Sequence, residues 1–218
     1  MHKLLIVDDH PLFRDALSLS LNQAASVLQL SQESPILYSA SLEDAFGQLQ
    51  RTSNIDLIML DLHLPGHDGF WGLVEIRKLY PAVAVVVISG NDDGATVAKA
   101  KACGASGFIS KSAMSSVIVE GVQAVLHGEE FWPAGRDDPD SEVANIAAKV
   151  HELTDQQMVV LKHLQEGRLN KQIAFDLDIS EATVKAHVTA IFRKLGVVNR
   201  TQAVILANKL QLDTPIAS

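Results

Sequence analysis

The sequence predicts an α/β domain with a doubly wound, five-stranded parallel sheet, followed by a small all-α domain of four helices. Up to about residue 126, short apolar runs alternate with segments of helical periodicity, whereas beyond residue 154 the periodicity is helical throughout. Between them, residues 128–140 are rich in Gly, Pro and acidic residues, which is typical of a connection between domains. We therefore expect a first domain over residues 1–127, a linker over 128–150 with a short helix, and a second domain over 151–218.

Five βα units fill the first domain. The apolar runs that we interpret as strands are Lys3–Val7, Ile36–Ser39, Leu57–Leu60, Ala84–Ile88 and Gly107–Ile109. The helices expected after them are Pro11–Leu21, Leu42–Leu49, Gly69–Leu79, Asp93–Cys103 and Ala113–Leu126. Because strands alternate with helices, the sheet is expected to be parallel and covered on both faces.

The second domain is expected to contain only helices. Their predicted ranges are Asp155–Glu166, Lys171–Leu177, Glu181–Leu195 and Gln202–Leu210, and the linker helix is expected over Ser141–Val150. Thr154 with Gln157 predicts a capping box at the first of the four. A short turn and the helix-start residue Ser180 separate the second from the third, which follows the helix-turn-helix plan.

Charge and composition exclude several classes of protein. The net charge is −8, but residues 1–132 hold 8 Lys and Arg against 15 Asp and Glu, whereas residues 151–218 hold 8 against 7. The acidity therefore does not argue against nucleic-acid binding by the second domain. The longest apolar run, Ala82–Ile88, is far shorter than the roughly 18 residues of a membrane helix. Cys103 is the single cysteine, so we expect a cytoplasmic protein without disulfides or membrane contact.

Polar residues stand where the expected strands end. They are Asp8, Asp9, Asp61, Ser89 and Lys111. In an open parallel sheet the carboxyl ends of the strands meet at one rim, near the point where the strand order reverses. Clustered carboxylates repel one another, and a hard divalent cation such as Mg²⁺ relieves that repulsion. The pattern predicts a magnesium site at which Asp61 attacks a phosphoryl group, while Ser89 and Lys111 bind its oxygens.

The motifs at these strand ends resemble the receiver domain of bacterial two-component response regulators. They are Ile6-Val7-Asp8-Asp9, Leu60-Asp61 with Leu64-Pro65 and Gly69, Ile88-Ser89-Gly90, and Gly107-Phe108-Ile109-Ser110-Lys111. The resemblance implies that Asp61 is the phosphoacceptor, and that Mg²⁺ is held by Asp8, Asp9, Asp61 and the main-chain carbonyl of His63. It also implies that Phe108 is the rotating aromatic of a switch. Ser112 departs from the family, because many receivers place a cis-proline there.

The third helix of the second domain has one apolar face, formed by Val184, Val188, Ile191 and Leu195. The opposite face presents Ala182, Ala186, Thr189 and Arg193, with Lys185 on its flank. This outer face is free to enter a major groove. Since alanine cannot hydrogen-bond a base, direct readout would depend on Lys185 and Thr189.

The second domain resembles a LuxR-type helix-turn-helix over about residues 152–212. The residues that carry the likeness include Asn170-Lys171, Ile179-Ser180, Thr183-Val184-Lys185, Lys194-Leu195-Gly196-Val197 and Asn199-Arg200. The resemblance, with the outer face above, assigns DNA contacts to Thr183, Lys185, Thr189, Arg193, Lys194 and Arg200. It also implies that a stripe on the last helix, Val204, Ala207 and Leu210, pairs two copies. The alternative is that this stripe packs inside its own domain.

The whole chain thus resembles a response regulator of the NarL/FixJ subfamily. This implies a transcription factor, not an enzyme beyond self-directed phosphoryl transfer and autodephosphorylation. A sensor histidine kinase would phosphorylate Asp61, and the chain would bind promoter DNA as a homodimer. Two alternatives are a phosphorylation-independent DNA-binding regulator with a vestigial receiver and an Asp-nucleophile phosphohydrolase. The second lacks an acid two residues after Asp61, where His63 stands. It also stays open whether the receiver covers the recognition helix or brings two copies together.

Overall fold

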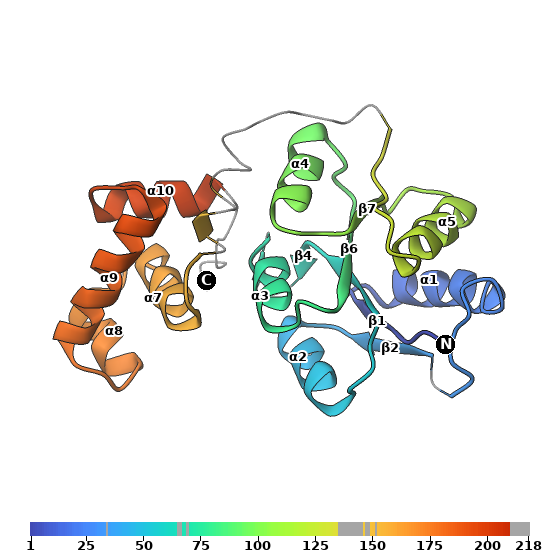
Figure 1. Ribbon diagram of the computed structural model, residues 1–218, viewed down its shortest axis with the longest axis horizontal. Coiled ribbons are helices and arrows are strands. Elements are labelled where there is room, and N and C mark those ends of the chain that lie inside the picture. The colour runs from blue at the N-terminus through green and yellow to red at the C-terminus, as the bar shows by residue number, and fades with distance from the viewer. Residues whose placement is uncertain are drawn as a thin grey trace.

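The computed structural model contains a sheet domain and a helical domain (Figure 1). It describes residues 1–33, 35–64, 67–68, 70–134, 146, 149–150 and 152–209. The linker helix expected over Ser141–Val150 lies mostly outside these residues. Of its described positions, Ile146 and Val150 are buried, in a core cluster that also contains buried residues of α7, α9 and α10.

The first domain contains the expected five-stranded parallel sheet. Its strands are β1 (Leu4–Val7), β2 (Ile36–Ser39), β3 (Leu57–Asp61), β6 (Ala84–Ser89) and β7 (Gly107–Ser110), in the order β2-β1-β3-β6-β7. A short antiparallel pair, β4 (His63–Leu64) with β5 (His67–Asp68), follows β3 and was not predicted. Strands of two residues have no periodicity that a sequence pattern can reveal. The strand order confirms the doubly wound topology.

Helices cover both faces of the sheet. They are α1 (Pro11–Gln23), α2 (Leu42–Arg51), α3 (Trp71–Leu79), α4 (Gly94–Ala102) and α5 (Ser115–Leu126). Leu4 and Ile6 pack with side chains of α1 and α5, whereas Leu5 and Val7 face the core beneath α2, α3 and α4. Because successive strand residues point to opposite faces, β1 contributes to both cores, and all four of its residues are buried.

The helical domain has the four expected helices. They are α7 (Asp155–Gln165), α8 (Asn170–Asp176), α9 (Glu181–Leu195) and α10 (Arg200–Lys209). The capping box at α7 is confirmed, because Gln157 N–H donates to Thr154 Oγ1 over 3.3 Å and Thr154 N–H donates to Gln157 Oε1 over 3.1 Å. Ser180 accepts the Thr183 N–H at the start of α9, and Gly196, at φ +72°, ends it. In the described part of the chain, no helix has the length and apolar character of a membrane span.

Candidate functional site

The carboxyl ends of the parallel strands bring the predicted polar side chains to one rim. The strand order reverses between the neighbouring strands β1 and β3. Asp8 directly follows β1 and Asp61 is the last residue of β3, so both lie at this switch point. Asp8 is 2% exposed, Asp61 is 3% exposed and Ser89 is fully buried. Isolated buried carboxylates are costly, so this rim requires compensating positive charge.

Lys111 supplies part of that charge. Its Nζ lies 2.7 Å from Asp61 Oδ2 and 2.7 Å from Asp8 Oδ2, over the ring of Phe13 at 4.9 Å from the ring centroid. The Lys111 N–H donates to the main-chain oxygen of Ser89 over 2.8 Å, which ties the end of β7 to β6. One ammonium group therefore bridges two buried carboxylates.

Burial dominates the electrostatics of Asp61. It raises the pKa of the carboxyl above its ordinary value of 3.8, although the hydrogen bonds from Lys111 and from the His63 N–H, 3.1 Å away, act in the opposite direction. Burial lowers the pKa of Lys111, but hydrogen bonds to Asp61 and Asp8 outweigh it, so this pKa is raised overall. The lysine is therefore charged at neutral pH, and it faces more carboxylate groups than it can neutralise.

The donor set fits a hard divalent cation. Ligand atoms of Asp8, Asp9, His10 and Asp61 lie within 4.8 Å of one another. Most are carboxylate oxygens, the ligands that Mg²⁺ prefers. His10 was missed by the sequence analysis, and its Nδ1 lies 2.8 Å from Asp9 Oδ1 and 3.3 Å from Asp8 Oδ1. His10 directly follows Asp8 and Asp9 in the sequence, and this position could have identified it as a member of the site.

The loop after β7 holds Lys111 without the proline of the family. Ser110 and Ser112 pair through their hydroxyl oxygens at 2.8 Å, and the Ala113 N–H donates to the Ser110 oxygen over 3.0 Å. No peptide bond is cis among the residues that the structure describes. A serine-bonded turn therefore takes the place of the cis-proline turn.

Phe108, the expected switch residue, lies inside the receiver. The side chain is already fully buried, in the core beneath α3 and α4. In this structure the ring therefore occupies the inward position. Its role as a switch stays a prediction.

The outer face of α9 is exposed, as the helical periodicity predicts. Ala182, Lys185, Ala186, Thr189 and Arg193 are all exposed, whereas Val184, Ile191 and Leu195 are buried. The Lys185 side chain is 65% exposed, with its Nζ 3.1 Å from Glu181 Oε1. Such an exposed ion pair is weak in water and can yield to a phosphate.

The hydroxyl groups of the two threonines that are predicted to contact DNA have hydrogen-bond partners at the N-cap of α9 or within the helix. Thr183 Oγ1 lies 2.8 Å from Ser180 Oγ at the N-cap, and Thr189 Oγ1 donates to the Lys185 main-chain oxygen over 2.9 Å. Both residues are exposed. Contact with DNA would require their hydroxyl groups to share or exchange these bonds.

Lys194 and Arg200 donate hydrogen bonds within the helical domain, and their contacts with DNA stay a prediction. Lys194 Nζ donates to the Glu152 oxygen over 2.7 Å and to Gln157 Oε1 over 2.8 Å. Arg200 Nη2 donates to the main-chain oxygens of Leu164, at 3.0 Å, and Arg168, at 2.7 Å. The last carbonyls of a helix have no partner within the helix, so Arg200 stabilises the end of α7.

This difference predicts opposite phenotypes for two arginines. Arg200→Ala is expected to lower the free energy of unfolding by about 1–2 kcal/mol, because charge-assisted hydrogen bonds are lost at a half-buried position. Arg193→Ala is expected to leave stability unchanged and weaken DNA binding, because Arg193 is exposed on α9. Urea unfolding and DNA titration of both variants measure the two effects. Reduced DNA affinity of Arg200→Ala at unchanged stability would contradict the structural role.

The stripe on α10 that was expected to pair two copies is only partly accessible. Ala207 is fully buried in its own domain, together with Ala203, so it has no surface to offer a second copy. Val204 is partly buried against the same core, and Leu210 lies outside the described residues. Packing within the domain therefore accounts for Ala207.

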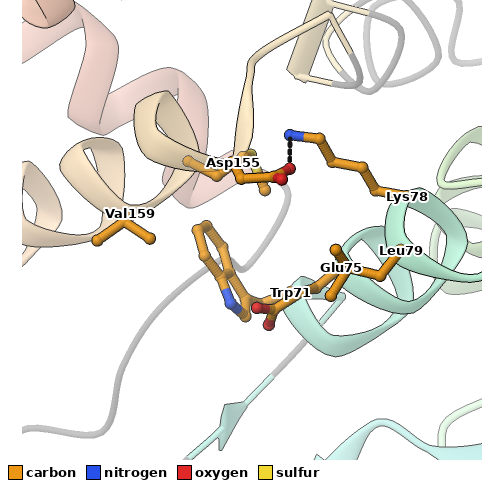
Figure 2. Close-up of a pocket in the computed structure, with 7 residues that line it drawn as sticks. Trp71, Glu75, Lys78, Leu79, Asp155 and Val159 are labelled. Carbon is orange, nitrogen blue, oxygen red and sulfur yellow. Dashed lines mark ion pairs between the residues drawn. The ribbon is translucent and has the colours of Figure 1, made fainter. Parts of the chain in front are cut away.

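The two domains touch through α3 and α7 (Figure 2). Lys78 Nζ of α3 lies 2.7 Å from Asp155 Oδ1 and donates to the Leu153 oxygen over 2.6 Å. Trp71 points from α3 toward α7, and Lys162 Nζ lies 5.9 Å from the centroid of its ring. On the side of the helical domain, the residues of this contact come from α7 and the turn before it, and the outer face of α9 stays exposed.

An acidic pocket at the switch point of a parallel sheet, followed by an exposed recognition helix, defines a phosphoryl-accepting regulator with a nucleic-acid-binding domain. Comparisons with known proteins agree. Residues 4–123 match the family described as response regulator receiver domain, and residues 151–207 match bacterial regulatory proteins of the luxR family.

Relatives align with this chain over almost their whole length. The glycerol metabolism activator of Pseudomonas putida is 36% identical over 96% of each chain. The nitrate/nitrite response regulator protein NarP of Escherichia coli is 30% identical over 94% of this chain and 93% of the relative. A solved structure of RcsB from Salmonella enterica serovar Typhimurium, bound to a promoter, shares the fold at a TM-score of 0.52 and 21% identity, over 95% of this chain and 98% of that one.

The chain belongs to the response regulator family. It combines a receiver domain, which is the partner of a sensor histidine kinase, with a LuxR-type DNA-binding domain, and the family regulates transcription.

Proposed function

We propose that phosphorylation of Asp61 by a sensor histidine kinase controls the binding of this chain to promoter DNA as a homodimer. One observation supports it above the others: a buried Asp61, bridged to Asp8 by Lys111, stands in the same chain as an exposed recognition helix. The domains of this proposal are a receiver over residues 1–127, a linker over 128–150 and a DNA-binding domain over 151–218. Its place of action is the cytoplasm, where promoter DNA is found.

Asp61 is the nucleophile of the proposed reaction. One of its carboxylate oxygens forms a bond to phosphorus, while the bond from phosphorus to the donor's leaving atom breaks and its electron pair stays on the donor. The Lys111 ammonium group, now 2.7 Å from Asp61 Oδ2, pairs with an equatorial phosphoryl oxygen. The Ser89 hydroxyl donates to another.

A magnesium ion fits this chemistry. Asp8, Asp9, Asp61 and the main-chain carbonyl of His63 would hold it, and when bound it neutralises charge on the phosphoryl oxygens. The proposal is supported by the donor set, in which oxygen ligands of three aspartates lie close together.

The chain is not an enzyme with an external substrate in this proposal. It transfers a phosphoryl group only to its own Asp61, and hydrolysis of that group restores the starting state. The residue two positions after Asp61 is His63, where the phosphohydrolase alternative needs a carboxylic acid. The exposed α9 favours regulation of transcription over that alternative.

Control of DNA binding works through association of two copies rather than by covering the recognition helix. The contact between α3 and α7 leaves the outer face of α9 exposed, which supports this choice. Two copies on adjacent half-sites double the number of DNA contacts.

The isolated fragment 141–218 tests this mechanism. It is expected to bind a single half-site duplex as tightly as the unphosphorylated full chain does, because the receiver leaves α9 accessible. Fluorescence anisotropy with both proteins on one duplex measures the two affinities. Much tighter binding by the fragment would mean that the receiver covers the recognition helix, which would contradict control by association.

A further inference from the structure

The outer edge of β7 is covered by the start of the linker. Since β7 is last in the strand order, its edge would otherwise present unpaired N–H and carbonyl groups. The Phe108 N–H donates to the Phe131 oxygen over 2.8 Å, and the Phe131 N–H donates to the Ser106 oxygen over 3.2 Å. Residues Glu130–Trp132, here called the edge segment, thus add a short parallel pairing to the sheet.

Successive side chains of the edge segment point to opposite faces of the sheet, as they do in a strand. Phe131 packs against the core on the α1 and α5 face, whereas Trp132 packs against the core on the opposite face. Lys101 Nζ at the end of α4 lies 5.3 Å from the centroid of the Trp132 ring, and Trp132 Nε1 donates to Glu130 Oε2 over 2.8 Å. The two aromatic side chains therefore hold the linker to the receiver from both faces.

Two glycines make room for Phe131. A Cβ atom at Gly121 would lie 2.7 Å from Phe131 Cδ1, and a Cβ atom at Gly107 would lie 2.8 Å from the Phe131 oxygen. Neither glycine has a positive φ, so space and not backbone conformation calls for glycine here. Gly121 lies inside α5, where glycine weakens a helix relative to alanine. The receiver thus contains a socket for the Phe131 ring.

The socket and the acidic pocket share one strand. Gly107 and Phe108, which hold the edge segment, begin β7, and Lys111 directly follows its end. Lys111 bridges Asp61 and Asp8 in the unphosphorylated chain. A phosphoryl group on Asp61 gives the ammonium group a new partner, and any shift of Lys111 acts on a strand of only four residues.

We propose that the edge segment is a conformational coupling device: phosphorylation of Asp61 weakens the hold of β7 on Phe131 and releases residues Glu130–Trp132 from the receiver. The inference rests on the proposed phosphorylation of Asp61. The segment is docked on β7 in the unphosphorylated chain, so a shift of β7 toward a second state can loosen it. Each freed residue adds up to about 3.5 Å of reach to the tether between the domains.

Amide hydrogen exchange of the full chain tests the coupling, with Mg²⁺ and a small acyl-phosphate donor. Phosphorylation, verified by intact mass, is expected to speed exchange at the Phe108 and Phe131 amides in the wild type and not in Asp61→Asn. Unchanged exchange in a chain whose mass shows phosphorylation would overturn the inference. A wild-type chain that gains no phosphoryl mass would instead overturn the proposed function.

Gly121→Ala tests the same coupling in the reverse direction. It is expected to expel the Phe131 ring and speed exchange without any donor. Because coupling is reciprocal, it is also expected to favour phosphorylation by at least about fivefold at limiting donor, the lower end of usual couplings. Phe131→Ala empties the socket without touching α5, and it is expected to give the same two results.

Gly47→Ala is the matched control for Gly121→Ala. Gly47 also lies inside a helix, α2, but a Cβ atom there would meet only the Arg51 side chain at 3.9 Å. It is expected to change neither exchange at Phe131 nor phosphorylation. If Gly121→Ala and Phe131→Ala both speed exchange but leave phosphorylation at the wild-type level, the edge segment is only structural and the inference is wrong.

Discussion

Asp61→Asn is expected to abolish phosphoryl acceptance while the chain stays folded. The amide has nearly the shape of the carboxylate but cannot act as the nucleophile. Intact-mass spectrometry with Mg²⁺ and a small phosphodonor decides the result: the wild type gains one phosphoryl group and the variant gains none. Asp15→Asn, an exposed position on α1, is the matched control and keeps the wild-type gain. Undiminished phosphorylation of Asp61→Asn would show that another residue accepts the group.

The same variant is expected to be more stable than the wild type at neutral pH. Burial raises the pKa of Asp61 above 3.8, so the folded state binds this proton more tightly than the unfolded state does. The unfolding free energy of the wild type therefore falls as the pH rises from about 3.8 through the folded-state pKa, and asparagine removes this fall. Urea unfolding without divalent cations, repeated over pH, measures it. A variant that is equally destabilised at every pH would contradict the assigned cause.

Lys185→Ala is expected to weaken DNA binding with no loss of stability. The side chain is 65% exposed on the outer face of α9, and its ion pair with Glu181 is exposed as well. If Lys185 contacts a phosphate, the variant is expected to reduce the slope of log affinity against log salt concentration by about one unit. If Lys185 contacts a guanine, the variant is expected to reduce the preference for that base by about 1–3 kcal/mol.

Titrations of Lys185→Ala over a salt series, on specific and scrambled duplexes, distinguish these two outcomes. Glu181→Gln is the matched variant with the opposite expected effect on DNA affinity, because it removes the charge that competes with phosphate for Lys185. It is expected to tighten binding. A Lys185→Ala variant that matches the wild type on both duplexes at every salt concentration would remove Lys185 from the interface.

Most of the receiver fold could be predicted because its strands are unbroken apolar runs. The run from Val85 to Ile88 is buried on both faces, as a central parallel strand must be. The pair β4 and β5 was not predictable, since strands of two residues carry no periodicity. The docking of Phe131 on β7 was missed for a similar reason, because a single bridged residue leaves no pattern.

The site followed from one geometric rule, that the ends of parallel strands share a rim. The rule placed Asp8, Asp61 and Lys111 together, and the distances agree. It did not find Arg14, whose Nη1 donates to the Asp8 main-chain oxygen over 2.8 Å from within α1. Such contacts depend on how a helix packs on the sheet.

Helical periodicity distinguished the buried face of α9 from its exposed face. It did not show whether a basic residue beyond α9, such as Arg200, is free at the surface or bonded within the domain. Arg200 resembles a surface charge in the sequence, yet it donates to carbonyl groups at the end of α7. Ala207 belongs to an apolar stripe, yet it is fully buried. Both outcomes depend on tertiary packing, which a one-dimensional pattern does not contain.

The central claim is that phosphorylation of Asp61 controls DNA binding. The most direct measurement is the affinity of the full chain for a duplex with two half-sites, selected from a random pool, with and without a small phosphodonor and Mg²⁺, with mass and oligomeric state followed in the same sample. The account predicts that the donor tightens binding of the wild type by about 5–150-fold, together with dimer formation, and leaves Asp61→Asn unchanged. Equal affinity of the phosphorylated and unphosphorylated wild type would contradict it.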